Sequence, residues 1–175
     1  GADVVRFGTP AAEPRLTDGF HREAGGAAEP FLWSKGEAEV AFQWAEATPR
    51  VAILDAAPFR GLREQTVEVR LNGTALEGFR LNDVRQRYRI ALPAAAQRPG
   101  DNRVRFVFAA TASPSDADPK SLDRRQLAAA FYTPVDGDLI TTGGIVSVAG
   151  TPYDFRTVRP IRFEGEDGPF AYDHN

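Results

Sequence analysis

Apolar and polar residues alternate with a period of two in three segments, at residues 37–44, 65–71 and 103–108. The apolar members are Ala38, Val40, Phe42 and Trp44 in the first, Val67, Val69 and Leu71 in the second, and Val104, Phe106 and Phe108 in the third. Successive side chains of a strand point to opposite faces, so this pattern predicts strands that are buried on one face only.

Turn residues separate these segments. Asn72-Gly73 suits a tight type I′ hairpin, and residues 98–102 combine Pro, Gly, Asp and Asn. Further strands are expected at 4–8, 50–56, 78–81, 87–93 and 127–132. Only short stretches such as 121–126 could be helical. Many short strands with frequent turns predict an all-β fold, an antiparallel β-sandwich of the jelly-roll kind.

After Tyr132 the pattern becomes less regular, with short apolar pairs between Gly, Pro and Asp residues. We therefore expect a β-sandwich domain at 1–131 and an irregular, β-rich C-terminal extension at 132–175. The chain contains no methionine, not even at position 1, which suggests a soluble piece of a larger polypeptide.

Composition excludes several classes of function. A formal net charge of -3, with Arg residues scattered among Asp and Glu, argues against a nucleic-acid partner. The absence of Cys excludes disulfides and thiolate metal sites, and the two His residues, His21 and His174, lack the spacing of a metal site. No apolar run approaches the ~20 residues of a membrane span. We expect no cofactor, no metal and no catalytic residue.

Residues 5–131 carry the segments RFGTPAAEPRLTDGF, FLWSKGEAEVAF, QTVEVRLNGTALEGFRL, RPGDNRVRFVF and DRRQLAAAF. Together these segments resemble galactose-binding-like accessory domains of bacterial membrane glycosyltransferases and sulfatase-like hydrolases. The resemblance implies a jelly roll that binds carbohydrate or positions a chain, usually without catalysis of its own, and it favours an extracytoplasmic location.

The segments TPVD, VAGTPYDFR and YDHN, within residues 132–175, resemble part of aldose 1-epimerase, the galactose mutarotase family. The resemblance implies that Asp173 hydrogen-bonds sugar hydroxyls. That family also needs a His acid and a Glu base in sequence contexts that this chain lacks. Epimerase activity is therefore not expected from these 175 residues.

Sugar-binding sandwiches place exposed aromatic rings against pyranose faces. Trp33, near a strand end, could contact a ligand or pack in the core, whereas Trp44 and Tyr88 are expected in the core. Arg124 and Arg125 follow a loop at 111–121 and are also ligand candidates, with ion pairs to nearby Asp residues as the alternative.

The sequence thus predicts a non-catalytic accessory module that binds carbohydrate and belongs to a larger carbohydrate-active protein, with substrate contacts at Asp173, Trp33, Arg124 and Arg125. The alternatives are an aldose 1-epimerase-type isomerase and a purely structural domain. The partners implied are a carbohydrate ligand and the rest of a larger polypeptide.

Overall fold

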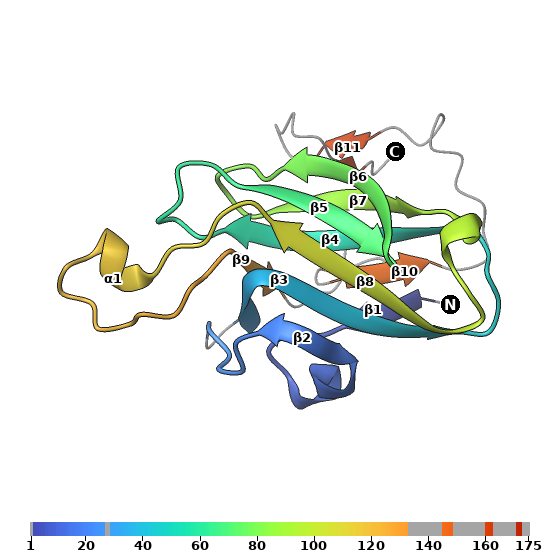
Figure 1. Cartoon of the computed structure of the whole chain (residues 1–175), viewed down its shortest axis with the longest axis horizontal. Coiled ribbons are helices and arrows are strands. Elements are labelled where there is room, and N and C mark those ends of the chain that lie inside the picture. The colour runs from blue at the N-terminus through green and yellow to red at the C-terminus, as the bar shows by residue number, and fades with distance from the viewer. Residues whose placement is uncertain (1, 27–28, 133–144, 149–159, 163–170, 173–175) are drawn as a thin grey trace.

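A computed structural model of the chain describes residues 2–26, 29–132, 145–148, 160–162 and 171–172 (Figure 1). The strands are β1 (Ala2–Val5), β2 (Leu16–Phe20), β3 (Phe31–Trp44), β4 (Arg50–Pro58), β5 (Thr66–Leu71), β6 (Thr74–Arg80), β7 (Gln86–Leu92), β8 (Gly100–Phe108), β9 (Ala129–Tyr132), β10 (Ile145–Val148), β11 (Pro160–Arg162) and β12 (Ala171–Tyr172). One short α-helix, α1 (Pro114–Ala117), and two 3₁₀ turns, η1 (Pro10–Arg15) and η2 (Ala94–Ala96), complete the described elements.

The strands form a two-layer antiparallel sandwich. The first layer has the order β2-β3-β8-β5-β6, and in the second layer β4 pairs with β7 on one edge and with β9 and β10 on the other. Strand β3 belongs to both layers, because Phe31–Trp33 pair with β9 and Glu37–Trp44 pair with β8. The all-β antiparallel sandwich expected from the alternation is confirmed. Strand β10 pairs with both β4 and β1, so residues 145–148 extend the second layer.

The core lies between the layers and includes the predicted apolar positions. The inward residues of β3, β5 and β8 are 0–7% exposed, and Trp44 and Tyr88 are also buried, as predicted. The ring of Phe131 occupies the centre, with ring centroids 5.2 Å from Phe7, 5.0 Å from Phe20 and 5.3 Å from Phe106.

Two turns confirm the sequence signals. Asn72 (φ +52°) and Gly73 (φ +86°) both adopt positive φ, as a type I′ hairpin requires. The Asn72 side-chain amide donates to the Ala96 carbonyl and to Asn102 Oδ1. The Asn72 side chain therefore joins the hairpin to η2 and to β8.

The prediction that residues 121–126 could be helical is wrong, because that segment has no regular structure. Asp123 Oδ1 accepts a hydrogen bond from the backbone N–H of Arg125, a local bond that competes with helix formation. A short turn of α-helix forms earlier instead, at α1, where Ser113 and Asp116 make a capping box. No helix in the described part of the chain is long and apolar enough to cross a membrane.

Candidate functional site

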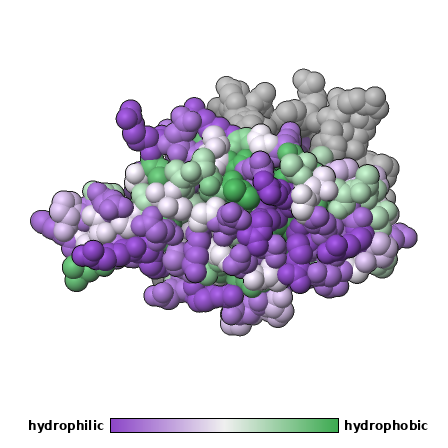
Figure 2. Space-filling model, in the orientation of Figure 1, coloured by the Kyte–Doolittle hydropathy of each residue, from purple (hydrophilic) through white to green (hydrophobic). Residues whose placement is uncertain are grey.

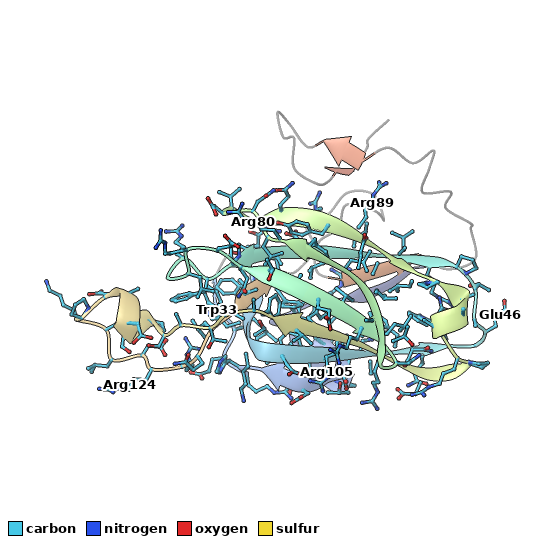
Figure 3. All side chains as sticks on the ribbon, turned by 45° about the horizontal axis from the view of Figure 1, so that its top comes forward. Trp33, Glu46, Arg80, Arg89, Arg105 and Arg124 are labelled. Carbon is cyan, nitrogen blue, oxygen red and sulfur yellow. The ribbon has the colours of Figure 1, made fainter. Side chains whose placement is uncertain are left out.

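Four aromatic side chains gather at one end of the second layer. Strand alternation turns Leu32 into the core and leaves Phe31 and Trp33 on the outer face, where Tyr132 lies directly opposite Phe31. Phe59 follows the end of β4 and contacts Trp33. We call Phe31, Trp33, Phe59 and Tyr132 the aromatic strip; Figure 3 labels Trp33 within it. Phe31, Trp33 and Tyr132 are partly exposed, and Phe59 is 8% exposed.

The rings of the aromatic strip touch in succession. The Trp33 ring centroid lies 5.6 Å from Phe59 and 5.3 Å from Phe31, with its plane turned by 86° and 88° from theirs. Phe31 continues to Tyr132 at 5.1 Å. Trp33 therefore meets its two neighbours in edge-to-face contacts, a favourable arrangement for aromatic pairs. Directly across the strands it faces Ala130, whose small side chain leaves room for the indole.

Two glycines let loops pack directly onto these rings. A Cβ on Gly25 would lie 2.4 Å from a Phe31 ring atom, and one on Gly61 would lie 2.4 Å from a Phe59 ring atom. Gly25 and Phe31 also exchange two backbone hydrogen bonds. The β2–β3 and β4–β5 loops thus fix Phe31 and Phe59, the two neighbours of Trp33, because no side chain separates loop from ring.

A charged cluster lies at the Tyr132 end of the aromatic strip. The Arg85 guanidinium carbon is 4.1 Å from the centre of the Tyr132 ring, within the range of a cation–π contact. Arg85 Nε and Nη2 donate to the two carboxylate oxygens of Asp55 at 2.8 and 2.7 Å, and Nη1 donates to Glu29 Oε1 at 2.5 Å. Burial lowers the pKa of Arg85, but the bonds to Asp55 and Glu29 outweigh it and raise that pKa overall. For the neutral Tyr132 phenol the effect of burial has the opposite sign, because burial disfavours the charged phenolate and raises the pKa.

The opposite face of the sandwich carries charge instead of rings. Figure 2 looks onto this face and shows hydrophilic residues over most of it, with a smaller hydrophobic patch near the middle. There Arg105 forms ion pairs with Asp18, Glu37 and Glu39. Such exposed pairs add little stability individually. We interpret this face as a solvated ion-pair network. Among the residues whose side chains are described, no group of three or more His, Cys, Asp or Glu could hold a metal ion.

Both predicted arginines lie on the β8–β9 loop. Arg124 is exposed on the projecting β8–β9 loop, well away from Trp33 in Figure 3. Arg125 forms a bidentate pair with Asp123, its Nε and Nη2 donating at 3.0 and 2.7 Å. The proposed ligand role of both arginines stays a prediction. Asp173 lies outside the described residues.

The Asp123–Arg125 pair gives a testable pH dependence. The Arg125 side chain donates to Asp123 and lowers the pKa of that carboxyl to about 2 from an ordinary value of 3.8. Because the pKa is depressed, the stabilisation is complete above the ordinary value and is lost as the pH falls through about 2. In an NMR titration of the carboxyl carbons, Arg125→Gln is expected to raise the Asp123 pKa toward 3.8. Arg124→Gln is the control and leaves it low; a wild-type value near 3.8 would contradict the pairing.

Sequence reasoning missed Phe31, Phe59 and Tyr132 and the charged cluster. The signal for Phe31 was available: FLW places Phe31 and Trp33 two positions apart, so both share one face of a strand. Asp55 is the one charged residue in the apolar segment VAILDAAP, which indicates a buried charge that needs a partner. The sequence does not identify that partner, because Arg85 follows 30 residues later, in the β6–β7 loop.

No family model and no curated protein matches the chain. Neither sequence resemblance therefore has a counterpart in those two comparisons, including the one to aldose 1-epimerase. Solved structures of carbohydrate-binding modules are similar to it. They include the CBM36-1 domain of a multidomain xylanase from the hindgut metagenome of Trinervitermes trinervoides, with 10% identity and a TM-score of 0.44 over 87% of this chain and 100% of that chain.

A family 35 carbohydrate-binding module from Clostridium thermocellum has 8% identity and a TM-score of 0.48 over 86% of this chain and 99% of that one. The CBM35 module from Cellvibrio japonicus Abf62 has 13% identity and a TM-score of 0.43 over 86% and 95%. At these scores the similarities carry no argument about a ligand.

Proposed function

We propose that the chain is a non-catalytic accessory module of a larger carbohydrate-active protein and that it binds carbohydrate at the aromatic strip. The observation that carries this proposal is the succession of partly exposed rings beside a charged cluster. The C–H faces of a pyranose pack on aromatic rings, and its hydroxyls bond to carboxylates and guanidinium groups. Trp33 is one of the two middle rings of the aromatic strip, and its indole is the largest of the four side chains, so it would make the largest apolar contact.

The Trp33→Ala variant tests this proposal. Losing one stacked ring, at roughly 0.5–1.5 kcal/mol per aromatic contact, is expected to weaken binding up to about tenfold. Isothermal titration with hexasaccharides of β-1,4-linked glucose, xylose and mannose measures the change. Trp33→Phe keeps a ring and is expected to retain most of the affinity. The Leu122→Ala variant, on the β8–β9 loop, controls for a general surface effect because Leu122 is 89% exposed.

The proposal fails if the wild-type chain binds none of the three hexasaccharides at millimolar concentration, or if Trp33→Ala binds as tightly as wild type. Polarimetry on fresh α-glucose separates the module from the isomerase alternative. A mutarotation rate equal to that of buffer is expected for the module, and a faster rate would favour the isomerase.

A further inference from the structure

We propose that Arg85 is a positioning residue of this site, holding Glu29 and Tyr132 so that the Glu29 carboxylate accepts a sugar hydroxyl beside the aromatic strip. This inference rests on the proposed function. Arg85 need not contact the ligand itself, because its guanidinium N–H groups already donate to the carboxylates of Asp55 and Glu29.

Asp55 fixes the guanidinium in place. Its side chain is 2% exposed on the central strand β4, and it receives both a 2.8 Å and a 2.7 Å bond from Arg85. A bidentate pair of this kind sets the plane of the guanidinium as well as its position. Arg85 is therefore anchored to the sheet although it comes from the β6–β7 loop.

The anchored guanidinium then holds two groups from other segments. Nη1 binds Glu29, at the end of the β2–β3 loop, and the guanidinium lies over the ring of Tyr132 at the end of β9. The Glu29 side chain is 41% exposed, so it can reach a ligand while one oxygen bonds to Arg85. One cation thus links four segments that are separate in the chain, and it places a hydroxyl acceptor next to the rings.

A neighbouring arginine separates this role from a purely structural one. Arg87 Nε lies 3.6 Å from Asp55 Oδ2, so the buried carboxylate keeps a cationic neighbour when Arg85 is replaced. The fold is therefore expected to tolerate the change better than the site does. A lysine cannot replace Arg85, because an ammonium cannot bond both Asp55 oxygens in plane and stack on Tyr132 at once.

Four variants test the inference: Arg85→Met, Arg85→Lys, Glu29→Gln and, as a control, Arg70→Met. Arg70 pairs with Glu68 at 2.5 Å on the opposite face of the sandwich. Titration with the same three hexasaccharides is expected to show affinity reduced about tenfold in Arg85→Met, barely recovered in Arg85→Lys, and reduced about fivefold in Glu29→Gln. Arg70→Met is expected to bind as wild type does.

Hydrogen exchange without ligand gives a second, independent readout. The Gly25 amide donates to the Phe31 carbonyl, and this hydrogen bond closes the end of the β2–β3 loop that contains Glu29. Its exchange is expected to accelerate about tenfold or more in Arg85→Met through local opening, while amides of β8 keep their wild-type protection.

The outcomes distinguish the two proposals. If wild type binds a hexasaccharide and Arg85→Met binds it equally well, the positioning role is overturned and the carbohydrate site stands. If wild type binds no hexasaccharide, the proposed function and the role of Glu29 as a hydroxyl acceptor both fall. In that case faster exchange at Gly25 would support Arg85 only as a residue that orders this loop, and unchanged exchange would overturn that as well.

Discussion

Replacing Phe131 by alanine is expected to destabilise the sandwich by about 4 kcal/mol, a typical cost of emptying a buried phenylalanine site. The side chain is 0% exposed on β9 of the second layer, and its ring contacts Phe20, Phe106 and Phe108 of the first layer as well as Phe7, which follows β1. Because β2, β8 and the segment after β1 hold these rings in place, we expect little collapse of the cavity around an alanine. Urea denaturation followed by tryptophan fluorescence measures the loss as a lower midpoint at an unchanged m-value.

The Phe131→Leu variant is the matched control. Leucine fills much of the volume, so the expected cost is roughly half that of alanine or less. If both variants unfolded at the wild-type urea midpoint, Phe131 would not be the ring that joins the two layers.

The inward faces of the strands could be predicted from sequence because alternation is local. A buried position such as Val104 or Val69 is recognised from its immediate neighbours. Strand β2 was not expected, because LTDGF places Asp18 and Gly19 where alternation would require a regular strand. Its pairing with β3 shifts register on both sides of Asp18. Such a bulge depends on the partner strand, which sequence reasoning does not supply.

The candidate site was predicted only in part, for a similar reason. The orientation of Trp33 follows from the alternation of β3 once that strand is known to run unbroken from Phe31 to Trp44. Sequence reasoning treated 37–44 as a separate strand, so the direction of Trp33 stayed open. The Arg85–Asp55 pair joins a loop to a strand through the fold, and no local pattern encodes it. Arg124 and Arg125 were candidates because loops often bind ligands. Arg125 forms an ion pair with Asp123 within the loop, and the ligand role of both arginines stays a prediction.

Replacing Gly19 by alanine is expected to destabilise the fold by about 3 kcal/mol or more, through two additive effects. Gly19 has φ +78°, a conformation that L residues rarely adopt. A Cβ there would also lie 1.8 Å from the Glu37 carbonyl oxygen and 2.7 Å from the Ala38 Cα. Both are backbone atoms of β3, so β2 would have to move away and pull Phe20 from its contact with Phe131.

The Gly73→Ala variant separates the two effects. Gly73 has φ +86°, but a Cβ there meets nothing within 4 Å, so only the backbone strain of about 1 kcal/mol is expected. The difference in urea midpoint between the two variants therefore measures the steric part. Equal midpoints would mean that β2 does not pack on β3 as closely as the structure shows. A larger loss for Gly19→Ala, together with faster amide exchange confined to β2 and the strand beside it, would show that the close approach at Gly19 holds this edge of the sandwich in place.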